Sequence, residues 1–429
     1  MHIHCTHGTP IADTLDYLPP LPLLINYSET ITKQDELGLY HALRLHDHVL
    51  YIDLYLPPSI LHKCPVLMDG PFPILEHLSL WSAAEKITTL TLPKAFLAPN
   101  LRHLDIPGIT PLRRLRLLTS TVSLVTLMLR DIQASSYLRP RLLVARIGSL
   151  PQLEELSIQF SAPIPRPSVE MELLGEKGTP VILPNLKTLK FRGVSAYLES
   201  LVAQIMTPLL ERLDITFFNQ IAFTLPHLSH FISITEGLKL PAAEVFFSHL
   251  EVFIIMTHHI SPSPGPFSLS VKCRQLDWQI DCAAQICSAL IPALSGVDKI
   301  TLNLYNTILP TEWEDGGIDK RTWNELLRSF VGARRLFLYG GLLEELSRAL
   351  QAEEAGLDPG FLPDLQDIVA ADNLFTSFVD TRRVVGRPVR FLPLQPLPLP
   401  PTPADRLPTQ AVRLPLQPPG KVFPRFVWQ

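Results

Sequence analysis

A six-residue phrase, Leu-x-x-Leu-x-Leu, recurs along this chain, usually after a turn that contains proline. Its clearest occurrences lie in five segments: Phe72–Leu80, Ala98–Ile106, Leu150–Ile158, Leu183–Phe191 and Thr207–Ile215. A fixed short pattern that returns every few tens of residues is the signature of a repeat architecture. Such repeats stack on one another and build extended surfaces that hold partners, rather than enclosed pockets for chemistry. The phrase therefore predicts a repeat fold with a binding function.

The spacing of the units is typical of leucine-rich repeats with insertions. Successive units start about 23 to 40 residues apart, and many steps fall in or near the range of about 20–29 residues expected for such repeats. The longer steps leave room for loops or extra helices on one face of the stack. The first apolar positions of the aligned units are Val49, Leu75, Leu101, Leu124, Leu153, Leu186, Leu210, Leu250, Cys273, Val297, Ala333 and Leu365.

Within each unit, apolar and polar residues alternate, which predicts one half-buried β-strand per repeat. In the first clear unit, Leu78 and Leu80 are expected to point inward, with His77 and Ser79 on the opposite face. Parallel neighbours need a crossover connection, and helical candidates occupy several gaps. These candidates are Leu37–Leu45, Leu138–Ser149, Ala196–Met206, Ala283–Leu294, Trp323–Val331 and Leu342–Gln351. We therefore predict an α/β fold, an irregular leucine-rich-repeat solenoid with a curved parallel sheet on one face and helices or loops on the other.

Two departures from the repeat pattern indicate irregularity. Regular repeats place Asn or Cys three residues after the last strand leucine. In this chain those positions hold Ala83, Ile109, Ile132, Ser161, Val194 and Phe218 instead. The second departure is that Val252, Ile254 and Met256 are apolar at positions predicted to face outward, so this strand is expected either to be buried on both faces or to expose an apolar patch.

Composition changes near both ends of the repeats. The 42 prolines are roughly twice the usual share of about 5%, so regular elements are expected to be short. Residues 1–35 are predicted to form an extended N-terminal segment, 36–390 the solenoid, and 391–429 a proline-rich tail. The tail is expected either to be disordered or to act as a polyproline ligand for SH3 or WW domains, with Arg390 three residues before Pro393.

The charge balance and the absence of targeting patterns exclude several classes of protein. The net charge is −4 and the isoelectric point is about 6.4, which does not fit a nucleic-acid-binding surface. No apolar stretch reaches the ~20 residues that span a bilayer, and the N-terminus does not read as a signal peptide. Five cysteines without paired spacing favour a reducing compartment. We therefore expect a cytoplasmic and/or nuclear protein without a membrane or nucleic-acid partner.

Catalytic motifs are not found in the sequence. It contains no phosphate-binding glycine loop, no G-x-S-x-G nucleophile elbow and no H-E-x-x-H zinc helix. His2, His4, Cys5 and His7 form the densest group of potential metal ligands, but they lie at a chain terminus, whereas a structural site needs four well-placed ligands on an ordered segment. We expect no catalytic residue, cofactor or metal site, and hence no enzyme.

The outward positions of the first strands are the best candidates for function. They combine aromatic and polar side chains, and Tyr, Trp and Arg dominate the energetic centres of protein interfaces. The alternative is that this face is merely solvated or covered by a neighbouring helix. The predicted partner-binding residues are Tyr51, Asp53, Tyr55, His77, Ser79, Trp81, His103 and Asp105.

Several phrases resemble a known family. They are Cys5-Thr6-His7-Gly8-Thr9-Pro10, Pro19-Pro20-Leu21-Pro22 with Ile25, the Pro71–Leu80 unit, Leu101-Arg102-His103-Leu104, Leu153-Glu154-Glu155-Leu156 and Gly386-Arg387-Pro388-Val389. Together they make residues 3–390 similar to the F-box and leucine-rich-repeat proteins of mushroom-forming fungi. In that family an F-box precedes the Cys-Thr-His-Gly-Thr-Pro stretch and binds the Skp adaptor of an SCF ubiquitin ligase, while the repeats select substrates.

The resemblance implies a protein-binding scaffold that serves as the substrate-recognition part of such a ligase. The residues before Cys5 do not form an F-box, so binding of the Skp adaptor is expected only if an F-box exists upstream. The alternative is a repeat-only interaction scaffold without a role in ubiquitin transfer. In either case the expected partner is a protein.

Overall fold

A computed structural model gives the fold of most of the chain. The residues it describes are 2–8, 21–28, 31–83, 90–108, 117–163, 180–258, 265–304, 320–340, 343, 346, 347, 350, 362–371 and 374–394. The chain divides into two units, Met1–Pro393 and Leu394–Gln429, and every element below belongs to the first. Residues 395–429 of the predicted tail and most of the candidate helix Leu342–Gln351 lie outside the described residues.

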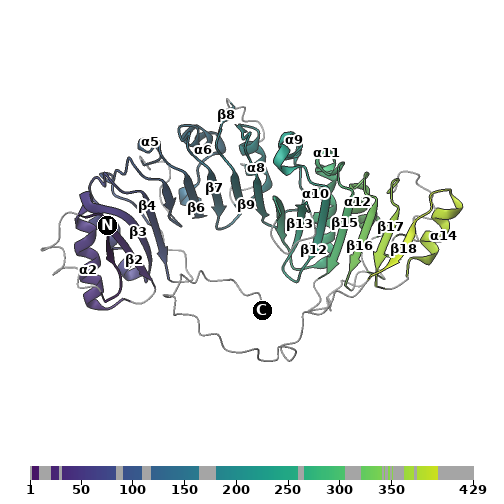
Figure 1. The fold of residues 1–429 in the computed structure, drawn as a ribbon, viewed down its shortest axis with the longest axis horizontal. Helices are drawn as coiled ribbons and strands as arrows, with labels where there is room; N and C mark the ends of the chain where they lie inside the picture. The colour runs from purple at the N-terminus through teal and green to yellow at the C-terminus, as the bar shows by residue number, and fades with distance from the viewer. Residues whose placement is uncertain are drawn as a thin grey trace, which may run out of the picture. The chain divides into compact units, whose positions relative to one another are not determined.

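A 16-stranded sheet forms the body of the first unit (Figure 1). Its strand order is β1-β2-β3-β4-β5-β6-β7-β9-β11-β14-β13-β12-β15-β16-β17-β18, and a separate parallel pair joins β8 to β10. The strands are β1 (Ile3–Cys5), β2 (Leu23–Ser28), β3 (Val49–Leu56), β4 (His77–Ser82), β5 (His103–Asp105), β6 (Thr126–Ile132), β7 (Glu155–Phe160), β8 (Val181–Ile182), β9 (Thr188–Gly193), β10 (Ile205–Met206), β11 (Arg212–Phe217), β12 (Ala242–Phe247), β13 (Glu251–Thr257), β14 (Phe267–Lys272), β15 (Lys299–Leu304), β16 (Arg335–Tyr339), β17 (Asp367–Ala370) and β18 (Arg390–Pro393).

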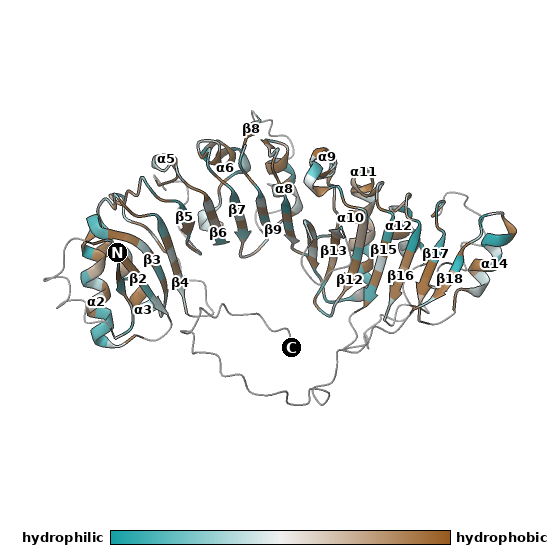
Figure 2. Ribbon diagram, in the orientation of Figure 1, coloured by the Kyte–Doolittle hydropathy of each residue, from teal (hydrophilic) through white to brown (hydrophobic). Residues whose placement is uncertain are grey.

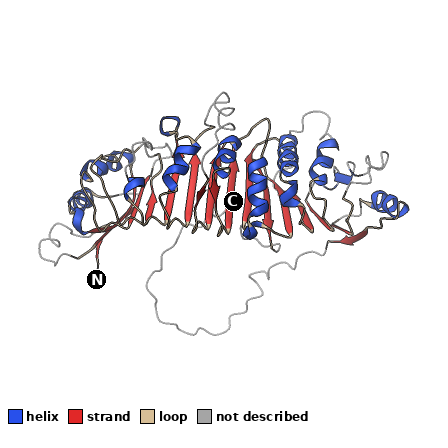
Figure 3. Cartoon of the chain, turned by 90° about the horizontal axis from the view of Figure 1, so that it is seen from above, coloured by secondary structure: helices blue, strands red, loops and turns tan. Residues whose placement is uncertain are grey.

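The described helices lie on one side of this sheet (Figure 3). We call the opposite face the outer face. Prolines occupy the first or second position of α3, α4, α6, α9 and α11, where the missing N–H group costs no hydrogen bond. The helices are α2 (Lys33–Arg44), η1 (His46–His48), α3 (Pro58–Leu61), α4 (Cys64–Leu67), α5 (Leu117–Ser120), η3 (Ala134–Ser136), α6 (Pro140–Ile147), α8 (Ser195–Val202), α9 (Pro226–Ile234), η4 (Glu236–Leu238), α10 (Leu276–Ala289), α11 (Ile291–Leu294), α12 (Lys320–Arg328) and α14 (Thr376–Val384).

The leucine phrases form strands, as predicted. Leu78 and Leu80 of β4 are fully buried, and so are Leu156 and Ile158 of β7. Hydrophobic and hydrophilic residues alternate along many strands (Figure 2). The side chains that point away from the outer face join one continuous hydrophobic core beneath the helices. The large, mostly parallel sheet and the mixed α/β character of the prediction are therefore confirmed.

The same backbone contacts recur from unit to unit. The N–H group of Leu101 donates to the carbonyl of Ala98 (3.2 Å), and Leu153 repeats this turn with Leu150 (3.2 Å). The backbone carbonyl of the residue after the first apolar position of a unit then accepts hydrogen bonds from two consecutive N–H groups at the start of the next strand. This second contact is made by the carbonyls of Glu76, Arg102, Val125, Glu154, Lys187, Asp298 and Arg334. Neighbouring units are thus joined in the same way along most of the sheet.

One predicted unit is wrong. The alignment that starts at Cys273 placed a strand over Leu276 and Trp278, but both residues belong to α10. Ile280, Ala283 and Cys287, all buried, follow at helical spacing and pack α10 against the core. A short apolar run fits the period of a β-strand as well as that of a helix. Here the apolar pattern continues at helical spacing over a longer stretch, and the segment forms a helix.

Beside this unit the parallel order is interrupted. After β11 the chain passes through α9 to β12, returns antiparallel along β13 and runs along β14 next to β11. Val252, Ile254 and Met256 of β13 are buried, at most 1% exposed, in the main core. They were predicted to face outward, and this is wrong: Phe253 and Ile255 occupy the half-buried alternate positions instead. A shift of one residue exchanges the two faces of a strand.

The two ends of the described sheet include residues from the predicted N-terminal segment 1–35 and from the predicted tail 391–429. Part of the predicted segment 1–35 forms β1, β2 and the start of α2, and all three pack in the same core. At the other end, β18 pairs with β17 through residue 393. The sheet therefore includes residues on both sides of the predicted range 36–390.

Candidate functional site

All eight predicted partner-binding residues lie on the outer face of three adjacent strands. Parallel pairing in register aligns them in rows that cross the strands. The first row is Tyr51, His77 and His103, the second is Asp53, Ser79 and Asp105, and the third is Tyr55 and Trp81. The structure thus brings together residues from three strands that are far apart in the sequence. We call this group, with Arg130 (see below), the aromatic patch.

The first row is a stack of rings. The rings of Tyr51 and His77 are nearly parallel, 13° apart, with centroids separated by 4.2 Å, and His103 lies 5.5 Å beyond His77. Burial lowers the pKa of His77 to about 4, helped by neighbouring His103 and opposed by Asp53. Burial also lowers the pKa of His103, as does nearby Arg102. The first row is therefore uncharged at neutral pH, which makes desolvation by a partner cheaper.

The second row contains a carboxyl group with an unusual pKa. Burial raises the pKa of Asp105 to about 6; Arg130 opposes this shift, and the carboxylates of Asp53 and Glu155 add to it. The Oδ1 atom of Asp105 is buried and accepts no hydrogen bond from the described part of the chain. Ser79 is only 7% exposed, so it lines the surface rather than projecting from it.

Arg130 completes the third row, and the sequence did not predict it. Its guanidinium carbon lies 4.8 Å from the centroid of the Trp81 ring, and its Nη2 atom lies 3.3 Å from Oδ2 of Asp105. Tyr55, on the strand beside Trp81, is 40% exposed. Trp, Tyr and Arg thus occur together on an exposed surface, the composition that dominates protein interfaces.

A β-bulge positions Arg130. The register of β6 against β7 shifts between Leu129 and Ile132, and Asp131 has a positive φ of 52°. Bulges of this kind redirect a side chain, and aspartate is one of the few residues that tolerate this conformation. The signal for the outward position of Arg130 was the period of two, because Met128 and Arg130 alternate with buried Leu127 and Leu129.

In the sheet order from β7 to β14 the outer face carries polar contacts between neighbouring strands. Lys190 contacts Glu155 at 2.7 Å across β7 and β9, and Ser268 donates to Asp214 at 2.9 Å across β11 and β14. Half-exposed ion pairs of this kind are worth about 0–1 kcal/mol. The outer face is therefore polar from β7 to β14 in the sheet order. On β12, β13 and β16 it carries half-buried aromatic side chains again, among them the Phe246–Phe253 pair and Phe337 beside Lys299.

The arrangement of the patch does not form a catalytic constellation. Within the described chain, no hydrogen bond joins Ser79 to His77 or His103, so no activated hydroxyl is assembled there. The rings stack instead of converging on a common point.

The N-terminal His and Cys residues are not gathered into one site. Cys5 is fully buried, and burial raises the pKa of its thiol to about 11, whereas the adjacent His4 is exposed. His7 contacts Ser28 and Asp35 instead. Among the described residues, no three His, Cys, Asp or Glu side chains are grouped so as to hold a metal ion.

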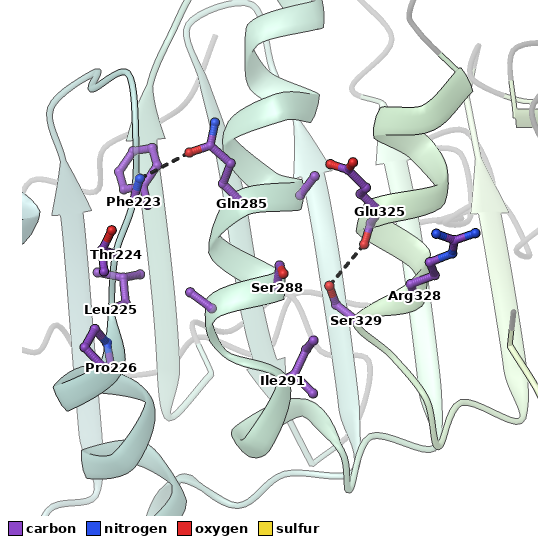
Figure 4. A pocket seen from close by; sticks show the side chains of 12 residues that line it. Phe223, Thr224, Leu225, Pro226, Gln285, Ser288, Ile291, Glu325, Arg328 and Ser329 are labelled. Atoms are coloured by element: carbon purple, nitrogen blue, oxygen red, sulfur yellow. Dashed lines mark hydrogen bonds between the residues drawn. The ribbon is translucent and has the colours of Figure 1, made fainter. Parts of the chain in front are cut away.

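Two hollows lie outside the aromatic patch. One, of about 550 Å³, lies among the helices between the start of α9, α10 and α12 (Figure 4). There the Phe223 N–H donates to Gln285 (3.1 Å), and the Ser329 hydroxyl donates to the Glu325 carbonyl (3.2 Å). Its lining is largely apolar, as expected for a gap between packed helices. The other hollow lies where β11, β14 and β13 end or begin.

Comparisons with known proteins do not identify the chain. No protein-family model matches it, and no curated protein matches it. Among the described helices, none is both long enough and apolar enough to cross a membrane.

Proposed function

We propose that this protein is a non-enzymatic protein-binding scaffold of the irregular leucine-rich-repeat type, and that the aromatic patch on a curved outer face is its main contact surface. The observation that carries the proposal is the patch itself: stacked neutral rings beside an exposed Tyr55 and a Trp81–Arg130 pair. Transfer of such aromatic surface from water into an interface lowers the free energy, which favours binding of a partner.

The recurring backbone contacts support the repeat interpretation. The same turn and the same double acceptance by a carbonyl appear in unit after unit, although the usual asparagine is absent. Buried Ile132, Val194 and Phe218 take its place, and backbone bonds such as Phe218 N–H to the Gly193 carbonyl (3.1 Å) hold the strand ends together. A stack of this kind offers an extended face for a partner.

Loss of the patch tests the proposal. Trp81→Ala combined with Arg130→Ala should remove a partner that proximity labelling detects with the wild-type protein in its native cell. Val66→Ala combined with Arg146→Ala, an exposed apolar and basic pair outside the patch, serves as the control and should retain that partner. If both double variants label the same proteins as wild type, the patch is not the contact surface.

Two versions of the proposal differ in what the scaffold does with its partner. In the first, it presents a substrate to an SCF ubiquitin ligase, which requires an F-box ahead of Cys5. In the second, it holds partners without recruiting a ligase. Purification of the full gene product from its native cell separates them: recovery of Skp and a cullin supports the first, and recovery of partners without either protein supports the second.

A further inference from the structure

The second hollow lies at the ends of β11 and β14, and both apolar and charged side chains line it. It measures about 660 Å³ and is lined by Asn219, Leu250, Glu251, Lys272, Cys273, Arg274, Gln275 and Trp278. It exists because β13 runs antiparallel, so that the start of β13 lies beside the end of β14. The hollow lies outside the aromatic patch and goes beyond the function proposed above.

Two large apolar side chains line the hollow and remain accessible. Trp278, on the first turn of α10, is 52% exposed, and Leu250, just before β13, is 46% exposed. The rest of α10 buries its apolar face in the core, so Trp278 is not needed for packing the helix. An exposed tryptophan beside a second apolar side chain is typical of a binding site.

The lining of the hollow carries two cations, Lys272 and Arg274, and one carboxylate, Glu251. Lys272 and Arg274 form no ion pair within the described part of the chain, although Glu251 is the direct cross-strand neighbour of Lys272. The acidic side chains closest in sequence to the lining cations are Glu251 and Asp277. The N-terminus of α10 also lies here. The side chain of the residue before it, Gln275, makes no capping bond, and Asp277 in the first turn of α10 complements the positive end of the helix dipole.

Hydrogen bonds hold the walls in place. The Gln279 side chain donates to the carbonyls of Ser248 and Cys273, both at 2.7 Å, and the Cys273 N–H donates to the Leu250 carbonyl at 2.9 Å. Gln279 is 1% exposed, so these bonds are shielded from water. A site that is formed before binding avoids the entropy of ordering its walls.

We propose that this hollow binds an acidic segment of a partner protein. An apolar side chain of the segment packs against Trp278 and Leu250, while neighbouring Asp or Glu side chains meet Lys272 and Arg274. A nucleic acid fits less well, because phosphate binding relies on a basic stripe and this hollow offers two cations on a chain of net charge −4. The occupant is therefore a peptide in which acidic and apolar residues alternate or adjoin.

A displayed library of random 12-residue peptides tests the proposal on the full chain. The library is selected on the wild-type protein and counter-selected on Lys272→Glu combined with Arg274→Glu. The surviving sequences should be rich in Asp and Glu next to Leu, Phe or Trp. Fluorescence anisotropy of one labelled survivor should show at least tenfold weaker binding to the charge-reversed variant and to Trp278→Ser, and weaker binding to wild type as salt rises.

Matched controls keep the result unambiguous. Lys94→Glu combined with Arg146→Glu makes the same change of charge at exposed positions outside the hollow and should bind the labelled peptide as wild type does. Thermal melts of all variants check that they are folded. A selection without acidic survivors, survivors that bind every variant equally, or displacement of the peptide by single-stranded DNA at lower concentration than by an unlabelled acidic peptide would each overturn the proposal.

Discussion

Asp131 shows how a single residue shapes the aromatic patch. Its positive φ of 52° accompanies the bulge that turns Arg130 toward Trp81 and Asp105. That the eight predicted residues share one face could be read from the sequence, because strands with period two, stacked in register, convert sequence positions into rows. Arg130 follows the same period of two after Met128, but its contacts with Trp81 and Asp105 could not be read, because they depend on the neighbouring strands and on the bulge.

Substitution of Asp131 tests the bulge. Glycine adopts a positive φ without strain, whereas a β-branched residue does not. Asp131→Val should therefore lower the free energy of unfolding by about 1–2 kcal/mol more than Asp131→Gly does. Urea unfolding followed by circular dichroism measures the difference, and equal stabilities would argue against a left-handed residue at this position.

The pH dependence of stability should reflect two opposing residues of the patch. The lowered pKa of His77, about 4 against an ordinary 6.5, means that the unfolded state binds the proton more tightly, so stability rises with pH between these values. The raised pKa of Asp105, about 6 against an ordinary 3.8, acts in the opposite direction over nearly the same range, so stability falls as pH rises.

Substitution of one of these two residues should reveal the pH dependence of stability that the other one causes. In Asp105→Asn the free energy of unfolding should climb more steeply from pH 4 to pH 6 than in wild type. In His77→Gln it should climb less steeply or fall. Urea titrations at several pH values give these slopes. Identical slopes in all three proteins would mean that neither group is perturbed as the structure indicates.

Among the elements, the connection between α8 and α9 depends on one buried carboxylate. Glu199 is fully buried, and its two oxygens accept the backbone N–H groups of His227 and Leu228, each at 2.8 Å, at the start of α9. Burial raises the pKa of Glu199, and these two bonds oppose the rise. A helix over Ala196–Met206 was predicted; α8 covers its first part, whereas Ile205 and Met206 form β10. The partner of Glu199 was not predicted, because it lies on another helix.

Truncation of Glu199 tests this connection. Glu199→Ala leaves two N–H groups without their acceptor in a buried place, at a cost of about 1–3 kcal/mol for each. We expect a loss of about 2–4 kcal/mol in the free energy of unfolding, and a smaller loss for Glu199→Gln, which keeps one acceptor. Chemical denaturation measures both. A loss below about 0.5 kcal/mol for the alanine variant would contradict the proposed cap.

At the scale of elements, the insertion β12–β14 marks the limit of what the sequence predicts. Of its three strands only β13 was predicted, because β12 and β14 fall in no aligned unit. The direction of the strands is set by pairing with β11 and β15, which short-range patterns do not encode. The prediction assumed parallel strands throughout. It therefore missed the hollow beside Trp278. The faces of Phe253 and Ile254 were misplaced for a different reason, the shift of one residue in the alignment that starts at Leu250.

At the scale of the whole first unit, stability comes from stacking of neighbours along one core. Leu156 is fully buried between the strands that precede and follow it. Leu156→Asp places an unpaired charge in that shared core, and β7 pairs only with β6 and β9 in the sheet. Hydrogen exchange should become faster over β6, β7 and β9 together. A cooperative melt unchanged from wild type would contradict the assignment of Leu156 to the core.

The central claim is that the outer face, and not the helical side, meets a protein partner. A photo-crosslinking amino acid placed at Tyr55, on the outer face, or at Val66, in α4, tests it most directly in the native cell. We expect a discrete crosslinked protein from position 55, lost when Trp81→Ala and Arg130→Ala are added, and none from position 66. Crosslinks from position 66 alone, or equally from both positions, would contradict the claim.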